Sequence, residues 1–270
     1  EDGVAEWLEQ QNDVILIRNQ ENKGFGFACN QGVEASKPGC DIFFLNNDTV
    51  VTANAIFWLR MGLYEHEKVG AVGSRSNYVG NEQQIEKPCN SVAEYLLFGK
   101  NNNVLHENPY EKKIWLSGFA LLIRRKALDE IGLFDLRFGM GFYEDNDLGV
   151  RLRYVGYQLL LCRNSFIFHY GSQSFRKCAG GAADKIAGNR RIFQEKWGYD
   201  IDKYTYINHD FIEMIEAKRD VPLRVLEIGC GAGVTLARIK YMWLQSDVRG
   251  IEPHEDVARL GRDYLGVECG

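Results

Sequence analysis

Short apolar runs that alternate with helical stretches are the feature that most limits what this chain can fold into. Residues 42–45, Ile-Phe-Phe-Leu, form such a run, and its β-branched and aromatic content is typical of a strand buried on both faces. Residues 52–67 follow with apolar side chains every three or four positions, the spacing of a helix. Further strand-like runs lie at 13–19, 69–76 and 114–125. This alternation predicts an α/β fold with a mixed, mostly parallel sheet.

A second pattern begins at residue 221. It reads as strand, glycine-rich turn and helix, and then repeats strand and helix up to residue 270. The stretch before it is polar and lacks a periodic pattern. We therefore expect a first domain over residues 1–205, a linker over 206–220, and a second, partial βαβα unit over 221–270.

Composition excludes several classes of function. Of the 270 residues, 45% are hydrophobic and 26% charged, which is ordinary for a globular protein. A net charge of -5 argues against a nucleic-acid partner, and no apolar run approaches the roughly 20 residues of a membrane helix. The seven cysteines are scattered without a C-x-x-C pair, which predicts neither a zinc site nor a disulfide framework and favours a reducing cytosol.

Two amides and a carboxylate stand where the strand at 42–45 ends. Asn46, Asn47 and Asp48 fall at the carboxyl end of a sheet strand, which is where α/β folds bind ligands. Their oxygens suit a hard divalent cation shared with substrate phosphates. The alternative is that the three residues cap the helix expected to begin near Thr52.

A group of acids opens a later helix. Glu144, Asp145 and Asp147 lie within four residues, where the helix dipole favours acids as caps. Like charges this close repel one another unless a cation or a basic partner is near, and one of the acids could serve as a general base. His169 ends an apolar strand, where a histidine is either structural or a ligand.

The turn in the second unit carries three glycines in alternation. Gly229, Gly231 and Gly233 follow a strand and precede a helix, so the backbone can approach a ligand closely. The pattern fits a dinucleotide or another nucleotide. Glu227 before the turn and Glu252 at the end of the next strand favour S-adenosylmethionine, because an acid there can bind ribose hydroxyls.

The first 200 residues resemble family 2 glycosyltransferases, and more narrowly their rhamnosyl- and galactofuranosyl-transferase-like branch. The resemblance is carried, in order, by the segments NKGFGFACNQG, FFLNNDT, WLSGFALLIRR, GLFD, FYEDNDLGVRLRYVGY and HYGSQS. It implies the Rossmann-like GT-A fold, a nucleotide-diphosphate-sugar donor and inversion at the anomeric carbon. The metal is Mg²⁺ or Mn²⁺, whose role is to stabilise the charge of the departing diphosphate.

The resemblance also implies roles for individual residues around the donor. Asn46, Asn47 and Asp48 take the place of the Asp-x-Asp site, with Asp48 as the main metal ligand and the two amides beside the substrate. His169 matches the histidine that completes the metal coordination. The first position of the motif is Asn46 rather than Asp, so the site carries less charge than the Asp form.

The catalytic and substrate-binding residues follow from the same match. Asp145 corresponds to the general base, and Glu144 lies beside it to bind acceptor hydroxyls. Trp115, Ser117 and Gly118 fall in the segment that shapes the donor-sugar and acceptor pocket.

Family members begin with a β-α-β unit that reads the nucleotide base, and this sequence starts just after it. Much of the nucleotide-binding half is therefore expected to be missing, and the chain as it stands to be weak or inactive. The C-terminal VLEIGCGAG and GIEP segments resemble the first two motifs of class I methyltransferases. That match covers about the first third of such a domain, so we expect no methyltransferase activity from the chain.

The leading hypothesis is an inverting, metal-assisted glycosyltransferase of bacterial surface polysaccharide synthesis. It would act on a glycan or lipid-linked acceptor, in the cytoplasm or at the inner face of the membrane as a peripheral protein. One alternative makes S-adenosylmethionine-dependent methylation the main activity. Another is a non-catalytic carbohydrate- or nucleotide-binding module whose acids are helix caps. Donor sugar, nucleotide and acceptor are not encoded in any recognisable motif.

Overall fold

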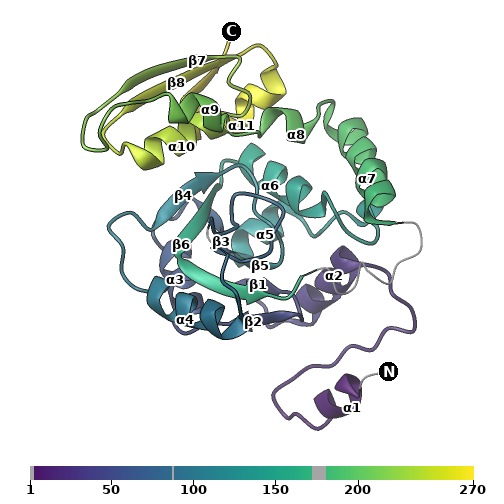
Figure 1. The fold of residues 1–270 in the computed structure, drawn as a ribbon. Coiled ribbons are helices and arrows are strands. Elements are labelled where there is room, and N and C mark those ends of the chain that lie inside the picture. The colour runs from purple at the N-terminus through teal and green to yellow at the C-terminus, as the bar shows by residue number, and fades with distance from the viewer. Residues whose placement is uncertain (1–2, 87, 172–180) are drawn as a thin grey trace.

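The structure is a computed structural model that describes residues 3–86, 88–171 and 181–270 (Figure 1). Its first element is the short helix α1 (Val4–Leu8), and α2 (Phe25–Ala35) follows after an irregular stretch. The strand expected at 13–19 is absent, which corrects that prediction. Val14, Ile15 and Ile17 are exposed there and pair with no other strand, so the apolar run has neither a ladder nor a core to join.

A six-stranded sheet forms the centre of the first 170 residues. Its strand order is β1-β5-β3-β6-β2, and β4 pairs with the edge of β6 opposite to β3. The strands are β1 (Ile42–Leu45), β2 (Thr49–Val51), β3 (Val69–Arg75), β4 (Tyr110–Lys113), β5 (Ala120–Ile123) and β6 (Gln158–His169).

The expectation of a mostly parallel sheet is wrong for this sheet. Among the pairings that the structure describes, only β3 with β6 is parallel, and the other four are antiparallel. The run at 114–125 was read as one strand, but β4 ends at Lys113 and β5 begins at Ala120. The residues between them form a loop at the sheet's edge. Apolar content alone does not reveal strand direction, which depends on how the chain crosses between strands.

Helices cover both faces of this sheet, and β5 shows why its residues are apolar throughout. Leu121 and Ile123 pack into a cluster with α2, α5 (Arg125–Ile131) and α6 (Glu144–Tyr154). Ala120 and Leu122 point the opposite way into a cluster with α3 (Ala55–Leu63). Successive strand side chains alternate between faces, so a strand buried on both faces has no polar face. A smaller cluster joins the distal half of β6 to α4 (Val92–Asn102).

The long strand β6 brings its last residue, His169, next to the end of the segment at residues 46–48. Its first half pairs with β3 and β4, and a register shift precedes the point where its second half continues to β2. The antiparallel register places His169 opposite Thr49, directly after Asp48. Residues 158–169 thus form one continuous strand that serves both halves of the sheet.

The C-terminal residues form a parallel sheet of three strands, β7 (Arg224–Ile228), β8 (Asp247–Glu252) and β9 (Val267–Cys269). Two helices, α10 (Val234–Met242) and α11 (Glu255–Leu265), connect the strands and pack on the sheet. Between the two sheets run α7 (Gly181–Trp197), α8 (Ile201–Tyr204) and α9 (His209–Glu213). As Figure 1 shows, α8 lies between α6 and the C-terminal sheet.

The two sheets are joined by a shared core and by buried polar contacts. One hydrophobic cluster contains Val150 of α6, Leu236 of α10 and Leu260 of α11. The Tyr264 hydroxyl donates to the carbonyl of Leu159 in β6 and accepts from its N–H at 3.2 Å. Satisfied buried polar groups of this kind fix the relative position of the parts that they join.

Candidate active site

Asp48 and His169 form the first polar cluster, at the junction of β1, β2 and β6. The Asp48 Oδ1 atom lies 3.0 Å from His169 Nε2, and Asn46 Nδ2 lies 3.4 Å from the same nitrogen. The other ring nitrogen, Nδ1, is 2.8 Å from the carbonyl oxygen of Tyr78. The Phe119 ring stacks on the imidazole at a centroid distance of 5.3 Å. The structure therefore brings into contact Asp48 and His169, which are 121 positions apart in the sequence.

The hydrogen bonding of His169 indicates what the cluster can hold. A carbonyl only accepts, so Nδ1 carries a proton facing Tyr78, and Nε2 is the ring nitrogen that faces the Asp48 carboxylate. A cation placed between Nε2 and the carboxylate would be bound by both, and an imidazole whose other nitrogen donates to a carbonyl is the usual arrangement of a metal ligand. The residues present thus fit a divalent metal.

The capping alternative for residues 46–48 finds no support in the geometry. Helix α3 begins at Ala55, its N-cap is Asn54, and no side chain caps it. The strand β2 separates Asp48 from that helix. Asn47 is exposed, and Asn46 is anchored through its backbone N–H, which donates to the Phe119 carbonyl at 2.8 Å.

No group of three or more His, Cys, Asp or Glu side chains that could hold a metal occurs among the described residues.

The acids at the start of α6 form the second cluster, and they divide into two kinds. Asp147 is fully buried and structural, since it pairs with Arg151 at 2.9 Å, with Lys196, and with the Trp197 indole N–H at 2.9 Å. Glu144 is buried with its Oε2 atom lacking a hydrogen-bond partner among the described residues. Asp145 is partly exposed, and neither it nor Glu144 forms an ion pair with a described cationic side chain.

The protonation of this acid pair is shifted by burial. Desolvation, and to a smaller extent the neighbouring Asp145 charge, raise the pKa of Glu144 to about 8. Desolvation raises the pKa of Asp145 to about 6, opposed by hydrogen bonds from the N–H groups of Gly118 and Asn146. Near neutral pH the pair therefore holds one proton between its two carboxyl groups. This is the state required of a general base next to a hydrogen-bond donor.

The backbone turn directly before α6 sets the position of Glu144 and Asp145. Phe142 and Tyr143, directly before α6, have φ values of 75° and 70°, which are unusual for residues with side chains. The strained turn is held by Asn189 of α7, whose Nδ2 donates to the carbonyls of Phe138, Gly141 and Phe142. The tie from α7 was not foreseen from the sequence, because a single asparagine in a basic helix carries no recognisable signal.

The segment between β4 and β5 joins the two clusters. The Gly118 N–H donates to Asp145 Oδ2 at 3.3 Å, and its neighbour Phe119 stacks on His169. The Ser117 N–H donates to Oε1 of the buried Gln83 at 2.6 Å. A side chain at Gly118 would contact Phe25 at 3.1 Å, so the close approach requires glycine. Tyr78, Gln83 and Phe119 are site residues that sequence reasoning missed.

Trp115 belongs to the same segment but approaches α6 one turn further along. A Cβ atom at Gly149 would lie 2.6 Å from that of Trp115, so glycine allows the tryptophan to pack there. Trp115 and Gly118 thus lie against the first turns of α6, and Ser117 stands between them in the chain with its N–H on Gln83.

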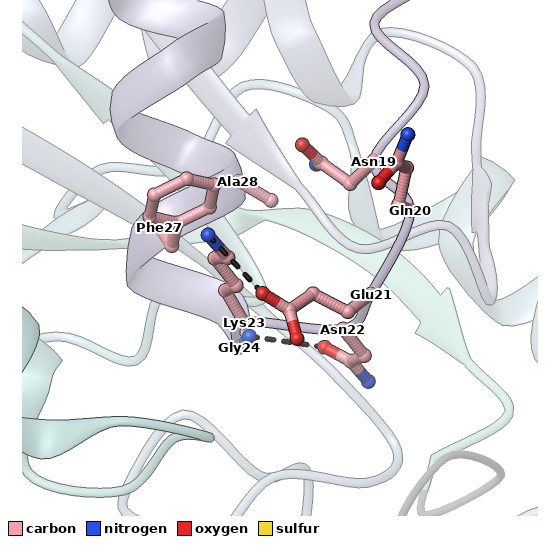
Figure 2. A pocket seen from close by; sticks show the side chains of 8 residues that line it. All are labelled: Asn19, Gln20, Glu21, Asn22, Lys23, Gly24, Phe27 and Ala28. Carbon is pink, nitrogen blue, oxygen red and sulfur yellow. Dashed lines mark hydrogen bonds and ion pairs between the residues drawn. The ribbon is translucent and has the colours of Figure 1, made fainter.

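A pocket of about 280 Å³ flanks this region at the start of α2 (Figure 2). Figure 2 shows Glu21 turned back toward Lys23, with 3.2 Å between carboxylate and ammonium, and Asn22 accepting the Gly24 N–H at 2.9 Å. The backbone of Gly24 presses against Gly139, where an added Cβ would lie 2.1 Å from the carbonyl oxygen. The pocket is therefore tied to the loop that precedes the acid pair.

The glycine turn of the C-terminal sheet differs, because its N–H groups already have acceptors. The Gly231 N–H donates to Glu252 Oε2 at 2.9 Å, and the Ala232 N–H donates to the carbonyl of Tyr204 in α8 at 2.9 Å. A Cβ atom at Gly231 would lie 2.6 Å from that same carbonyl oxygen. The Glu252 carboxylate also accepts the His254 N–H at 3.0 Å.

The remaining residues predicted to bind S-adenosylmethionine do not open this turn. The N–H groups of Gly229 and Gly233 donate to Ile251 and Cys230, respectively. Glu227 has one buried carboxyl oxygen without a described partner, and burial raises its pKa to about 7. With α8 seated on the turn, the residues present do not fit the cofactor.

The comparisons with known proteins agree with the geometry of the first 170 residues. The glycosyltransferase-like family 2 profile matches residues 1–180. Two strains of Mycobacterium tuberculosis have N-acetylglucosaminyl-diphospho-decaprenol L-rhamnosyltransferases that are 39% identical over 67 residues, which is 24% of this chain and 22% of theirs. The chain thus spans less than a quarter of the length of these relatives.

A solved structure shares the fold. GalNAc-T7, crystallised with UDP, GalNAc and Mn²⁺, superposes with a TM-score of 0.52 at 15% identity, covering 78% of this chain and 41% of that one. No helix in the described part of the chain combines the length and hydropathy needed to cross a membrane. Since the family profile accounts for 180 of the 270 residues, the chain belongs to the glycosyltransferase-like family 2.

Proposed function

We propose that this chain carries the centre of an inverting glycosyltransferase that moves a sugar from a nucleoside-diphosphate donor to a hydroxyl of a glycan or lipid-linked acceptor. The observation that carries the proposal is the link through Gly118 and Phe119. One residue binds the candidate base Asp145 and the next stacks on the candidate metal ligand His169. The base and the cation site are therefore held by a single rigid segment.

Asp48 and His169 would hold Mg²⁺ or Mn²⁺ together with the donor's phosphates. When bound, the metal supplies positive charge that stabilises the departing nucleoside diphosphate. Two protein ligands suffice for such a role, since Mg²⁺ is commonly held by one or two protein groups with phosphates and water completing the shell. Asn46 donates toward His169 and orients the ring, and the exposed Asn47 is placed to meet substrate.

Asp145 would act as the single base that inversion requires. Its carboxylate takes the proton of the acceptor hydroxyl while the acceptor oxygen bonds to the anomeric carbon and the bond from that carbon to the diphosphate breaks. Gly118 and Asn146 hold the carboxylate by their N–H groups, at 3.3 and 2.9 Å. Glu144, protonated at neutral pH by its raised pKa, can donate a hydrogen bond to an acceptor oxygen.

The biological setting follows by analogy. The mycobacterial relatives are named for a decaprenol-linked acceptor, which favours a lipid-linked acceptor for this chain and a role in bacterial surface polysaccharide synthesis. Such an acceptor would place the enzyme at the cytoplasmic face of the membrane. We propose no methyl transfer, because the closed glycine turn leaves the cofactor no site.

The test is a pair of binding and transfer measurements on the chain. Titration with UDP and with dTDP, each with and without Mn²⁺, should show metal-dependent binding that Asp48→Ala weakens. Transfer or donor hydrolysis should be lost in Asp145→Asn while nucleotide binding remains. If nucleotide binding is equally strong without metal, or unaffected by Asp48→Ala, the cation site is wrong. If Asp145→Asn transfers sugar like the wild type, the base is wrong.

A further inference from the structure

A second cavity lies at the seam between the two sheets, with a volume of about 210 Å³. It is lined by the loop at residues 80–83 that follows β3, by the end of β4 with Ile114 and Trp115, and by Asp202 and residues 205–207, the segment that includes the end of α8. No motif in the sequence predicts this cavity, because its walls come from segments about 120 residues apart.

The seam cavity is connected to the candidate active site by two side chains. Gln83 lines the cavity and is almost fully buried; its amide donates to the Ser74 carbonyl and accepts the Ser117 N–H. Ser117 precedes Gly118, which holds the candidate base. Trp115 lines the cavity and packs on Gly149, one turn along α6 from Asp145. A group bound in the cavity therefore lies along the same segment that positions the base.

The lining has the chemistry that recognises sugars. Trp115 and Tyr206 contribute aromatic faces, and neither the Trp115 indole N–H nor the Tyr206 hydroxyl has a partner within the described residues. Such rings bind apolar faces while their polar ends bind hydroxyls. Thr205 donates its hydroxyl to the Ile201 carbonyl, which leaves its oxygen able to accept.

Charge and size exclude other occupants. The lining contains two lysines, Lys112 and Lys113, and two acids, Glu82 and Asp202, so it carries no net charge that would attract a phosphate. Lys113 pairs with Glu111 at 2.9 Å, and the Lys112 ammonium donates to the Tyr264 carbonyl at 2.9 Å. The volume is below the roughly 300 to 1,000 Å³ of sites for drug-sized ligands. A single neutral sugar ring is the class of ligand that matches.

We propose that the seam cavity binds one sugar unit of the acceptor, next to the unit that is glycosylated. This rests on the transfer reaction proposed above, and it makes the segment at 202–207 part of the acceptor site. The C-terminal sheet and its helices then help to bind the acceptor but supply no catalytic residue, because Val234 of α10 lines the cavity.

The experiment measures sugar binding without catalysis. Methyl glycosides of glucose, galactose, rhamnose and N-acetylglucosamine are titrated into the chain and followed by saturation-transfer NMR. We expect at least one to bind, Tyr206→Ala to weaken that binding about tenfold, and Trp115→Phe to weaken it as well. Phe57→Ala is the matched control, because Phe57 is an aromatic residue of similar exposure on α3.

The outcomes separate this inference from the proposed function. Binding of no glycoside, or equal binding by wild type and Tyr206→Ala, overturns the seam site. Metal-dependent UDP or dTDP binding tests the transferase centre independently and should be unchanged in Tyr206→Ala. Loss of nucleotide binding in Asp48→Ala with sugar binding retained supports two separate sites. Loss of both ligands in Tyr206→Ala overturns the inference, because the substitution then acts on the fold.

Discussion

The chain contains two strand-end sites, and they differ in whether the backbone beside their polar side chains is already occupied. At the centre of the first sheet, the Asp48 carboxylate faces Nε2 of His169, and Glu144 has an unpartnered buried oxygen. At the glycine turn of the C-terminal sheet, the backbone N–H groups donate to Glu252, to Tyr204 and to neighbouring carbonyls. Buried polar groups left without partners are costly. Glu227 beside the turn also has one, so the contrast lies in the backbone N–H groups of the turn, which Glu252 and the end of α8 already occupy.

The largest expected effect comes from removing the base at the first site. Asp145→Asn should lower the transfer rate about 100- to 10,000-fold, because the amide cannot accept the hydroxyl proton. Nucleotide binding should stay within about twofold. The wild-type rate should rise with pH through about 6, where Asp145 loses its proton. A rate that is flat from pH 5 to 7 would contradict the assignment of Asp145.

Asp147→Asn is the matched control in the same acid cluster. Asp147 is paired with Arg151 and Lys196 in the interior, so its substitution should lower the free energy of unfolding by about 3 kcal/mol. The rate per folded molecule should stay near that of the wild type. Denaturant unfolding and the transfer assay together separate the two acids, and a stable but inactive Asp147→Asn would reverse their roles.

Removing the His169 imidazole from its contact with Asp48 should have the next largest effect. We expect His169→Ala to weaken Mn²⁺-dependent nucleotide binding about 10- to 100-fold, because the imidazole no longer completes the site. Titration calorimetry measures the change. If the variant binds nucleotide as tightly as the wild type, the contact between Asp48 and His169 has another purpose.

At the second site we expect a structural effect of a few kcal/mol. Gly231 has a φ of 57°, and an alanine there would add left-handed strain and a Cβ in contact with Tyr204. Gly231→Ala should lower the free energy of unfolding by about 2 kcal/mol. Gly32→Ala is the control, since Gly32 lies in α2 with open space around it, and it should be neutral or stabilising. Equal effects of the two substitutions would refute close packing of α8 on the turn.

A pH-dependent effect on stability is expected from Glu144→Gln. Because the folded-state pKa of Glu144 is raised from 4.5 to about 8, the folded state binds more protons than the unfolded state between these values. The wild type should therefore lose stability as pH rises from 4.5 to 8, by at most about 1.4 kcal/mol per pH unit. Unfolding of the variant followed across this range should show a shallower decline. Parallel pH profiles would mean that Glu144 is solvated.

No measurable effect is expected from S-adenosylmethionine. Titration of the chain with this cofactor should give no heat of binding, since the turn is closed by α8. Micromolar binding would break the contrast between the two sites, and it would show that α8 leaves the turn readily.

Particular residues show how far the sequence alone reached. The strand at 42–45, the acid group at 144–147 and His169 were all identified, because apolar runs and clustered charges are visible in a linear sequence. The run at 13–19 was misread as a strand, since its apolar content is the same whether or not a neighbouring strand is available. Asp147 could not be told from Asp145, because its cations come from Arg151 and from α7.

The sequence by itself determined the α/β class, the positions of the polar strand ends and the family resemblance, because these depend on local patterns of apolar, glycine and acidic residues. Only the tertiary structure decided that most strand pairings of the central sheet are antiparallel, that Gly118 and Phe119 join base to cation site, and that α8 closes the glycine turn. These features are contacts between segments far apart in the chain. They depend on chain crossings and on which buried groups find partners, and no local pattern contains that information.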